Sequence, residues 1–71
     1  MKNTIKVERA RHSLSQQELA DKLGITRQSV CAIEASRFIP STLLALKMAK
    51  LFQIPVEDLF MLEANETTNI H

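Results

Sequence analysis

The side chains best suited to chemistry lie on one face of the segment from Arg27 to Ala35. Arg27 and Gln28 stand at its start, and their planar groups match the donor and acceptor edges of guanine and adenine. At about 100° per residue, Cys31, Ala32 and Ala35 fall on the same helix face, and small side chains let a helix approach base edges. The pattern predicts a helix that reads nucleobases. A surface helix that is merely rich in alanine is the alternative.

Capping residues before this helix define a second helix and a tight turn that lead into it. Ser15 is a preferred N-cap, and Glu18 three residues later completes a capping box. Gly24, the one glycine in the chain, suits the left-handed end of that helix. Thr26 then caps the next helix only two residues later. Two helices joined so closely cross at a steep angle, which is the helix-turn-helix geometry and indicates DNA.

The rest of the chain predicts an all-α fold, a compact five-helix bundle that could include a short extended C-terminal segment. The expected helices span about residues 3–12, 16–23, 27–35, 42–52 and 56–60. The first has a weak pattern, with Ile5 and Ala10 inward, and the stretch from Lys2 to Ile5 could instead be extended. The fourth carries two apolar stripes, one of which includes Leu46, so we expect it to be central.

The chain is expected to form one domain. Residues 1–62 make up the predicted DNA-binding unit, with its motif at 15–35, and residues 63–71 are expected to be a mostly flexible tail. At the end of the first unit, Met61 and Leu62 could form a short strand.

Composition narrows the class of protein. A length of 71 residues suits one small domain. No apolar run approaches the ~20 residues that span a bilayer, and the start of the chain does not resemble a signal peptide. One cysteine cannot form an internal disulfide. These features predict a cytoplasmic protein without membrane association.

The charge is divided along the chain. Residues 1–55 carry all nine Lys and Arg against four acids, a net of +5, whereas residues 56–71 carry four acids and no Lys or Arg. A basic body with an acidic end suits a protein that faces phosphates on one side. Chance partition of a few charges is the alternative.

Other kinds of chemistry find little support. His12 and His71 stand alone, without partners at metal-ligand spacing. A single glycine cannot supply a glycine-rich phosphate loop, and Ser15 and Ser41 are explained as helix caps. We therefore expect no enzyme activity, no cofactor, no metal and no small-molecule ligand.

The run from Ser15 to Glu34, S-Q-x-E-L-A-D-K-L-G-I-T-R-Q-S-V-x-x-I-E, resembles the Cro/C1-type (XRE) helix-turn-helix family of bacterial and phage regulators. The similarity continues through residues 40–41, 44–50 and 56–60, and covers roughly residues 5–60. It implies a lambda-repressor-like bundle of four or five helices whose third helix enters the major groove. Short members of the family usually act as homodimers on inverted-repeat operators.

The resemblance also implies roles for single residues. Gln16 would hold the DNA backbone and steady the first side chain of the next helix, although it could be only an exposed polar residue. Arg9 and Glu34 would form a partly buried structural ion pair, the alternative being two surface charges. Arg37 could reach a phosphate; the family often has Asn-Gly before this position, whereas this chain has Ala35 and Ser36.

Three further residues complete the predicted DNA-binding set of Gln16, Thr26, Arg27, Gln28, Ser29, Cys31 and Arg37. Thr26 is a cap that could share a phosphate or base contact. Ser29 lies on the flank, where its hydroxyl suits a phosphate. Cys31 is expected near a base or sugar as a small side chain, and redox regulation of its thiol is the alternative.

Together these features predict a sequence-specific regulator of transcription that binds double-stranded DNA and acts as a repressor. We expect a homodimer that forms through the fifth helix with Met61 and Leu62. The alternative is an antitoxin-like or other helical module that binds a second protein.

Overall fold

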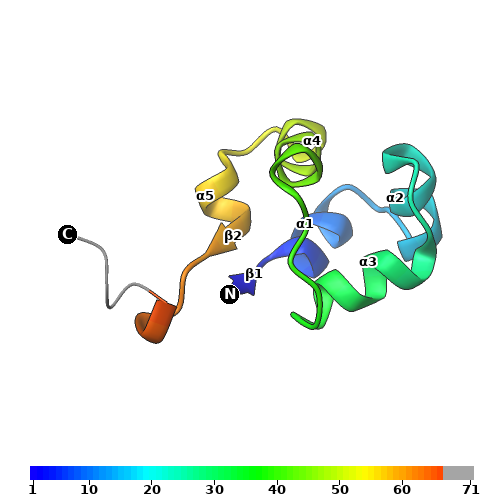
Figure 1. The fold of residues 1–71 in the computed structure, drawn as a ribbon. Coiled ribbons are helices and arrows are strands. Elements are labelled where there is room, and N and C mark those ends of the chain that lie inside the picture. Colours follow the sequence, from blue (N-terminus) through cyan, green and yellow to red (C-terminus); the bar gives the residue numbers. More distant parts are fainter. Residues whose placement is uncertain (67–71) are drawn as a thin grey trace.

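The computed structural model describes residues 1–66 and contains five α-helices, so the predicted all-α class is confirmed (Figure 1). The elements in chain order are β1 (Lys2–Asn3), α1 (Ile5–Arg11), α2 (Gln16–Leu23), α3 (Arg27–Glu34), α4 (Thr42–Phe52), α5 (Val56–Leu59), β2 (Phe60–Met61) and the 3-10 turn η1 (Ala64–Glu66). Within this part of the chain, no helix is long and apolar enough to cross a membrane.

The ends of α2, α3 and α4 follow from local side chains. Ser15 and Glu18 form the predicted capping box at the start of α2, and Gly24 ends that helix with a left-handed φ of 70°. Thr26 accepts a hydrogen bond from the amide of Ser29, and Ser41 caps α4 in the same way. These caps satisfy backbone amides that a helix leaves free at its first turn. The predicted bounds of α2 and α4 are confirmed, and α3 begins as predicted but ends at Glu34, one residue early.

The core lies where α2, α3 and α4 meet the ends of the chain. It consists of the buried side chains Ile5, Leu19, Ala20, Leu23, Val30, Ile33, Met48, Ala49, Phe52 and Leu59. Helix α4 supplies three of them, in keeping with its predicted central place. Its second apolar stripe is not wholly covered, because Leu46 is 52% exposed. That edge of α4 opens onto a groove instead of packing on a helix.

Helix α1 buries a different face from the one predicted. Ile5 is fully buried as expected, but Ala10 is exposed and the buried side chain in the middle of the helix is Glu8. Arg11, one turn later, approaches the Glu8 carboxylate with its Nη1 3.1 Å from Oε2. An ionised partner can compensate a carboxylate for the loss of water. A pattern of apolar residues alone could not show this orientation.

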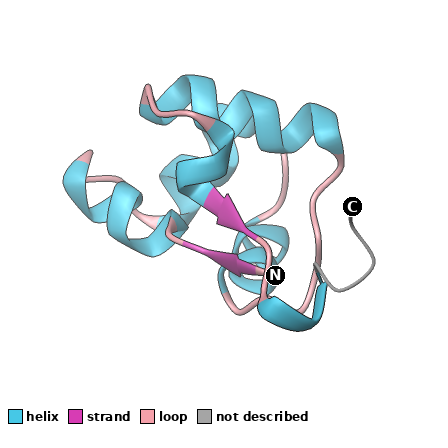
Figure 2. Ribbon diagram, turned by 90° about the vertical axis from the view of Figure 1, so that its left-hand side faces the viewer, coloured by secondary structure: helices cyan, strands magenta, loops and turns pink. Residues whose placement is uncertain are grey.

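Two short strands join the ends of the bundle (Figure 2). β1 pairs with β2 in antiparallel fashion, Lys2 opposite Met61 and Asn3 opposite Phe60. The amide of Thr4 also donates to the carbonyl of Leu59 at 3.0 Å. The extended alternative for the first residues thus holds for Lys2 and Asn3, whereas Ile5 already belongs to α1. The short strand is observed one residue earlier than expected, at Phe60–Met61, and Leu62 after it is 55% exposed.

Part of the predicted tail lies beside the chain start. The amino group of Met1 is 3.4 Å from a carboxylate oxygen of Glu63 and 3.0 Å from one of Glu66. The hydrogen bond with Glu66 raises the pKa of this amino group. The rest of the predicted tail, residues 67–71, lies outside the described residues.

Candidate nucleic-acid interface

Helices α2 and α3 form a pair joined by a tight turn. After Gly24, the amide of Ile25 donates to the carbonyl of Ala20 at 3.0 Å, which closes the end of α2. Helix α3 then packs its Val30 and Ile33 into the core, at 0% and 1% exposure. Figure 1 shows α3 at the outer edge of the bundle, with one long side uncovered by other helices. A straight helix held this way can enter a groove of about 12 Å width.

The uncovered side of α3 begins with the two predicted base-reading residues. Arg27 and Gln28 are both exposed, and Ala35 at the far end is exposed as well. Cys31 and Ala32 lie half-buried between them. The face is therefore shallow in its middle and carries long polar side chains at its N-terminal end. This is the arrangement that direct contact with base edges requires.

Gln16, the first residue of α2, connects the two helices through its side-chain amide. Its Nε2 donates to Glu34 Oε1 at 3.1 Å, while its Oε1 accepts from the thiol of Cys31 at 3.1 Å. The same oxygen lies 3.5 Å from Nε of Arg27, a long hydrogen bond. Gln16 is half-buried, so the alternative of a purely exposed polar residue is wrong. The amide steadies the start and middle of the exposed face of α3.

Behind Gln16, Glu34 meets Arg9 of α1. Nε of Arg9 lies 2.8 Å from Glu34 Oε2, and Nη2 lies 3.5 Å from Oε1. Nη1 of Arg9 donates to the carbonyl of Leu14 at 2.9 Å. Their side chains are 17% and 9% exposed, so the pair is largely withdrawn from water. The structure thus joins the loop after α1, the start of α2 and the end of α3 in one polar cluster.

The remaining predicted residues lie at the two ends of α3. At its start, the hydroxyls of Thr26 and Ser29 are 3.0 Å apart, and Thr26 also caps the helix. Thr26 is exposed and Ser29 is half-buried. At the other end, Arg37 is exposed in the loop after α3, and its amide donates to the carbonyl of Ala32 at 2.9 Å. Residues Thr26 and Arg37 therefore flank the exposed face rather than lying on it.

Sequence reasoning missed Asn3 as a support of this face. Its Nδ2 donates to the carbonyl of Ile33 at 2.9 Å and approaches Ser36 Oγ at 3.5 Å, so β1 is tied to the end of α3. Its Oδ1 accepts from the amide of Ile5 at the start of α1. An asparagine just before a helix is a signal for the second contact, but no local signal indicates the first.

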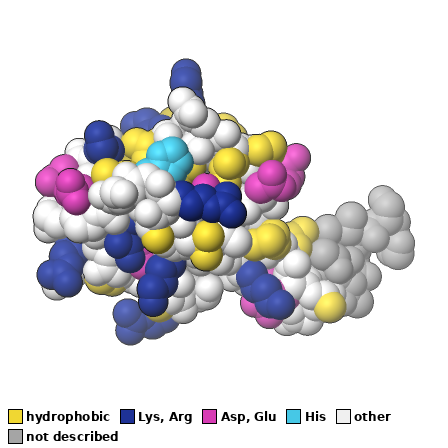
Figure 3. Space-filling model, turned by 180° about the vertical axis from the view of Figure 1, so that it is seen from behind, with side chains coloured by type: hydrophobic (Ala, Val, Ile, Leu, Met, Phe, Trp, Pro, Cys, Tyr) yellow, Lys and Arg dark blue, Asp and Glu magenta, His cyan; other side chains and the backbone are white. Residues whose placement is uncertain are grey.

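Charged side chains are unevenly distributed over the surface. In Figure 3, Lys and Arg side chains gather at the lower left, on the side of the molecule that carries α2 and α3. Helix α5, with Glu57 and Asp58, lies on the other side of α4 from α2, and η1, with Glu66, lies beyond β2 (Figure 1). A cationic side next to an exposed helix favours a polyanion.

A family model described as helix-turn-helix matches residues 5–59. The chain belongs to the helix-turn-helix family. The match covers the helices from α1 to α5 and includes Arg9, Gln16, the whole of α3 and Arg37. It confirms the resemblance to the Cro/C1-type family that the residues from Ser15 to Glu34 indicate.

Similar proteins come from archaea and bacteria. An uncharacterized HTH-type transcriptional regulator of Methanocaldococcus jannaschii is 48% identical over 66 residues, which are 93% of this chain and 100% of that protein. One from Bacillus subtilis, YgzD, is 51% identical over 63 residues, 89% of this chain and 96% of its own length. Another from Archaeoglobus fulgidus is 36% identical over 66 residues, 93% of this chain and 94% of its own.

Proposed function

We propose that this helix-turn-helix protein is a transcriptional regulator that binds specific sites in double-stranded DNA, and that it acts as a repressor. The observation that carries the proposal is the exposed face of α3, which begins with Arg27 and Gln28 and is anchored from behind by the buried Val30 and Ile33. The names of the similar proteins from M. jannaschii and B. subtilis agree with this function. Repression follows when such a protein occupies DNA that a polymerase must enter.

Base recognition is assigned to the start of α3. The guanidinium of Arg27 can donate two hydrogen bonds to O6 and N7 of guanine, and the amide of Gln28 can pair with N6 and N7 of adenine. Each such pair discriminates by about 1–3 kcal/mol. Cys31, one turn further along, would lie near a base or sugar.

Phosphate contacts are assigned to the surrounding residues. Gln16 begins α2, an eight-residue helix, and its position suits a phosphate of the DNA backbone. The hydroxyls of Thr26 and Ser29 and the guanidinium of Arg37 flank the same face. Such contacts provide most of the affinity and position α3 without reading sequence.

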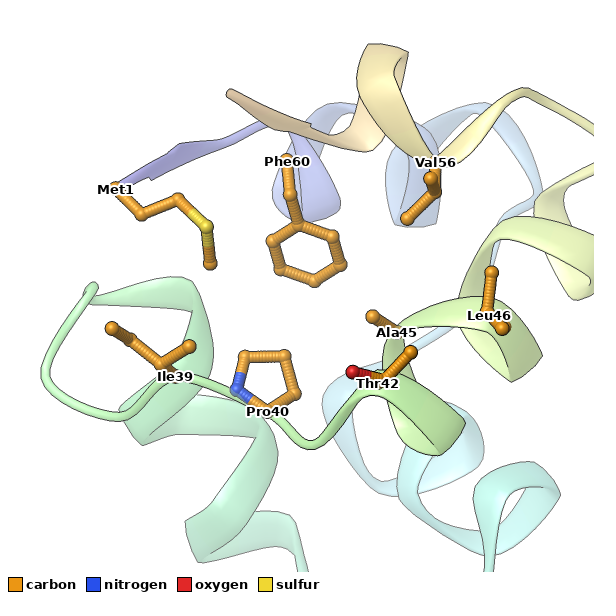
Figure 4. Close-up of a pocket in the computed structure, with 8 residues that line it drawn as sticks. All are labelled: Met1, Ile39, Pro40, Thr42, Ala45, Leu46, Val56 and Phe60. Carbon is orange, nitrogen blue, oxygen red and sulfur yellow. The ribbon is translucent and has the colours of Figure 1, made fainter. Parts of the chain in front are cut away.

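A second copy of the chain is the proposed partner, bound on the side of α5 and β2. An apolar groove of about 270 Å³ lies there between α4, α5 and the loop after α3 (Figure 4). Its lining includes Pro40, Val56 and Phe60, and Ile39 and Leu46 on it are 63% and 52% exposed. Apolar side chains left in water at such a rim favour burial against another surface.

The place of this groove supports a dimer that reads an inverted repeat. Ile39 follows the end of α3 by five residues, so the groove begins close along the chain to that end of the helix. A two-fold axis at the groove, with both copies of α3 on one side of the dimer, is the arrangement that we propose. Such dimers set two recognition helices about 34 Å apart, in successive major grooves. Met61 and the exposed Leu62 continue from β2 and would extend the contact.

Selection of bound sequences from a pool of random DNA duplexes tests the proposal. We expect recovery of an inverted repeat, and binding that weakens with salt at a slope of about −0.9 per phosphate contact. Arg27→Ala combined with Gln28→Ala should bind random DNA nearly as well as the native chain but lose its preference for the selected site. If the double variant kept the native preference, base reading by α3 would be refuted.

Sedimentation tests the dimer separately. Leu46→Glu should yield monomers, because a charge would be buried in the contact, whereas Leu43→Glu, on the exposed side of α4 outside the groove, is the matched control. A Leu46→Glu variant that stayed dimeric would exclude the groove, and Leu62→Glu tests the contact beyond β2 in the same way. A complex with another protein in place of DNA binding would favour the antitoxin-like alternative.

A further inference from the structure

Glu34 is set at the back of the α2–α3 pair, yet it is linked to the exposed face by a chain of hydrogen bonds. Arg9 holds one carboxylate oxygen at 2.8 Å through Nε. The other oxygen accepts from Nε2 of Gln16 at 3.1 Å. Gln16 in turn accepts from Arg27 and Cys31 on α3. The carboxylate is therefore two contacts away from the guanidinium that is proposed to read a base.

The charge of Glu34 decides which way the Gln16 amide faces. An ionised carboxylate only accepts hydrogen bonds, so the amide must turn its NH2 group toward Glu34. The carbonyl oxygen is then directed at Arg27 and Cys31, which both donate. With the amide reversed, two acceptors would face each other on one side and donors on the other. Glu34, which only accepts, and Arg27, which only donates, thus require the same orientation, and the Cys31 thiol is compatible with it as a donor.

This orientation has a consequence for Arg27. Its Nε is the nitrogen that approaches Gln16, at 3.5 Å. Within residues 1–66, Nη1 and Nη2 form no hydrogen bond or ion pair with another residue. These two nitrogens form the outer edge of the guanidinium, the edge that can donate to both O6 and N7 of guanine. Holding Nε from behind reduces the side-chain entropy lost when the outer edge binds.

We infer that Glu34, held by Arg9, is a positioning residue for DNA recognition: it fixes the Gln16 amide so that Gln16 presents the outer edge of Arg27 to the groove. The inference rests on the proposed function and adds a residue that would not touch DNA. Glu34 does more than brace α3 against α1, because the amide that it orients belongs to the reading face.

A double-mutant cycle between Glu34 and Arg27 tests this inference. The probe is the duplex recovered by the native chain from random DNA, compared with a copy changed at the base pair where Arg27→Ala loses discrimination. Glu34→Gln should weaken binding to the recovered duplex at least about twofold more in the native background than in the Arg27→Ala background. It should also lower discrimination between the two duplexes, since a neutral amide no longer fixes Gln16.

Two further variants separate positioning from folding. Gln16→Met keeps the length of the side chain and leaves Arg9 with Glu34, and it should reproduce the loss of discrimination. Glu34→Asp keeps the charge beside Arg9 but shortens the reach to Gln16, so it provides the same cycle if Glu34→Gln does not fold. Glu8→Gln is the matched control, a buried carboxylate on α1 that pairs with Arg11 and is not among the hydrogen-bond partners of the Gln16 side chain. It should leave discrimination unchanged.

The outcomes are distinct. Glu34→Gln could lower the affinity for the recovered duplex equally in the native and Arg27→Ala backgrounds and leave discrimination between the two duplexes unchanged. That result would overturn the positioning role and leave the proposed function standing. Failure of the native chain to recover any preferred duplex would overturn the proposed function and this inference with it. Coupling between Glu34 and Arg27 that disappears in the Gln16→Met background would support the whole chain of contacts.

Discussion

Replacing Arg9 by methionine would test the polar cluster behind the reading face. The substitution removes three contacts: two with the Glu34 carboxylate, at 2.8 and 3.5 Å, and one with the carbonyl of Leu14 at 2.9 Å. Methionine fills similar space but cannot donate. Glu34 would keep one hydrogen bond, from Gln16, while its side chain is only 9% exposed. A carboxylate would thus be left largely out of water without its cation.

The expected cost follows from this burial. Breaking a buried pair by removing one partner costs about 3–5 kcal/mol. Because the Arg9 side chain is 17% exposed, the cost should lie at the lower end of this range. We therefore expect a loss of about 3 kcal/mol in the free energy of unfolding. A domain of this length has about 4–10 kcal/mol in total. Thermal unfolding should then shift downward by about 10–25 °C.

Urea unfolding followed by circular dichroism measures the loss, with Lys6→Met as control. Lys6 is an exposed cation on the same helix, and its replacement should change stability by less than about 0.5 kcal/mol. Adding Glu34→Leu to Arg9→Met should recover part of the loss, because no unpaired charge remains. A loss below about 0.5 kcal/mol for Arg9→Met would refute the reasoning, since that is the value of an exposed pair.

Three other substitutions have defined outcomes. Gly24→Ala should lower the free energy of unfolding in urea by about 1–2 kcal/mol. The new Cβ meets nothing within 4 Å, so the cost comes from the φ of 70° alone. An unchanged urea midpoint would contradict this. Hydrogen bonding from the Ser15 amide lowers the pKa of the Glu18 carboxylate from its usual 4.5. The ionised carboxylate therefore contributes fully to stability above pH 4.5, and this contribution is lost as the pH falls through the lowered pKa. Glu18→Ala should therefore lower the urea midpoint at pH 7, and the difference from the native chain should shrink in acid; a constant difference would argue against the capping carboxylate. Asn3→Ala should cost about 1–2 kcal/mol, because the bond to the carbonyl of Ile33 is lost, and hydrogen exchange should rise at the end of α3 rather than at its start.

Elements with strong local signals could be predicted from the sequence. The capping box at Ser15, the glycine at the end of α2 and the cap at Thr26 act within a few residues, so their effect does not depend on the rest of the fold. For the same reason α4 begins directly after Ser41, as expected. The exposed face of α3 could also be predicted, because helical periodicity fixes which side chains share a face.

The pairing of β1 with β2 and the burial of Glu8 were harder to predict from the sequence. Two-residue strands carry almost no pattern, and β1 and β2 are separated by nearly the whole chain. The rotation of α1 depends on which of its sides meets the other elements, and a weak apolar pattern did not define it. Ala10 was expected inward and is exposed for this reason.

The sequence by itself determined where the central helices begin and end, and that Arg27 and Gln28 share an outward face, because both depend on neighbours within one or two turns. Only the tertiary structure decided how that face is supported. The support comes from three helices, through Arg9 of α1, Gln16 of α2 and Glu34 of α3. The direction of the Gln16 amide depends on how these helices place its partners around it. Long-range polar contacts of this kind leave no periodic trace in a sequence, since each partner needs only a donor or an acceptor at the right place in space.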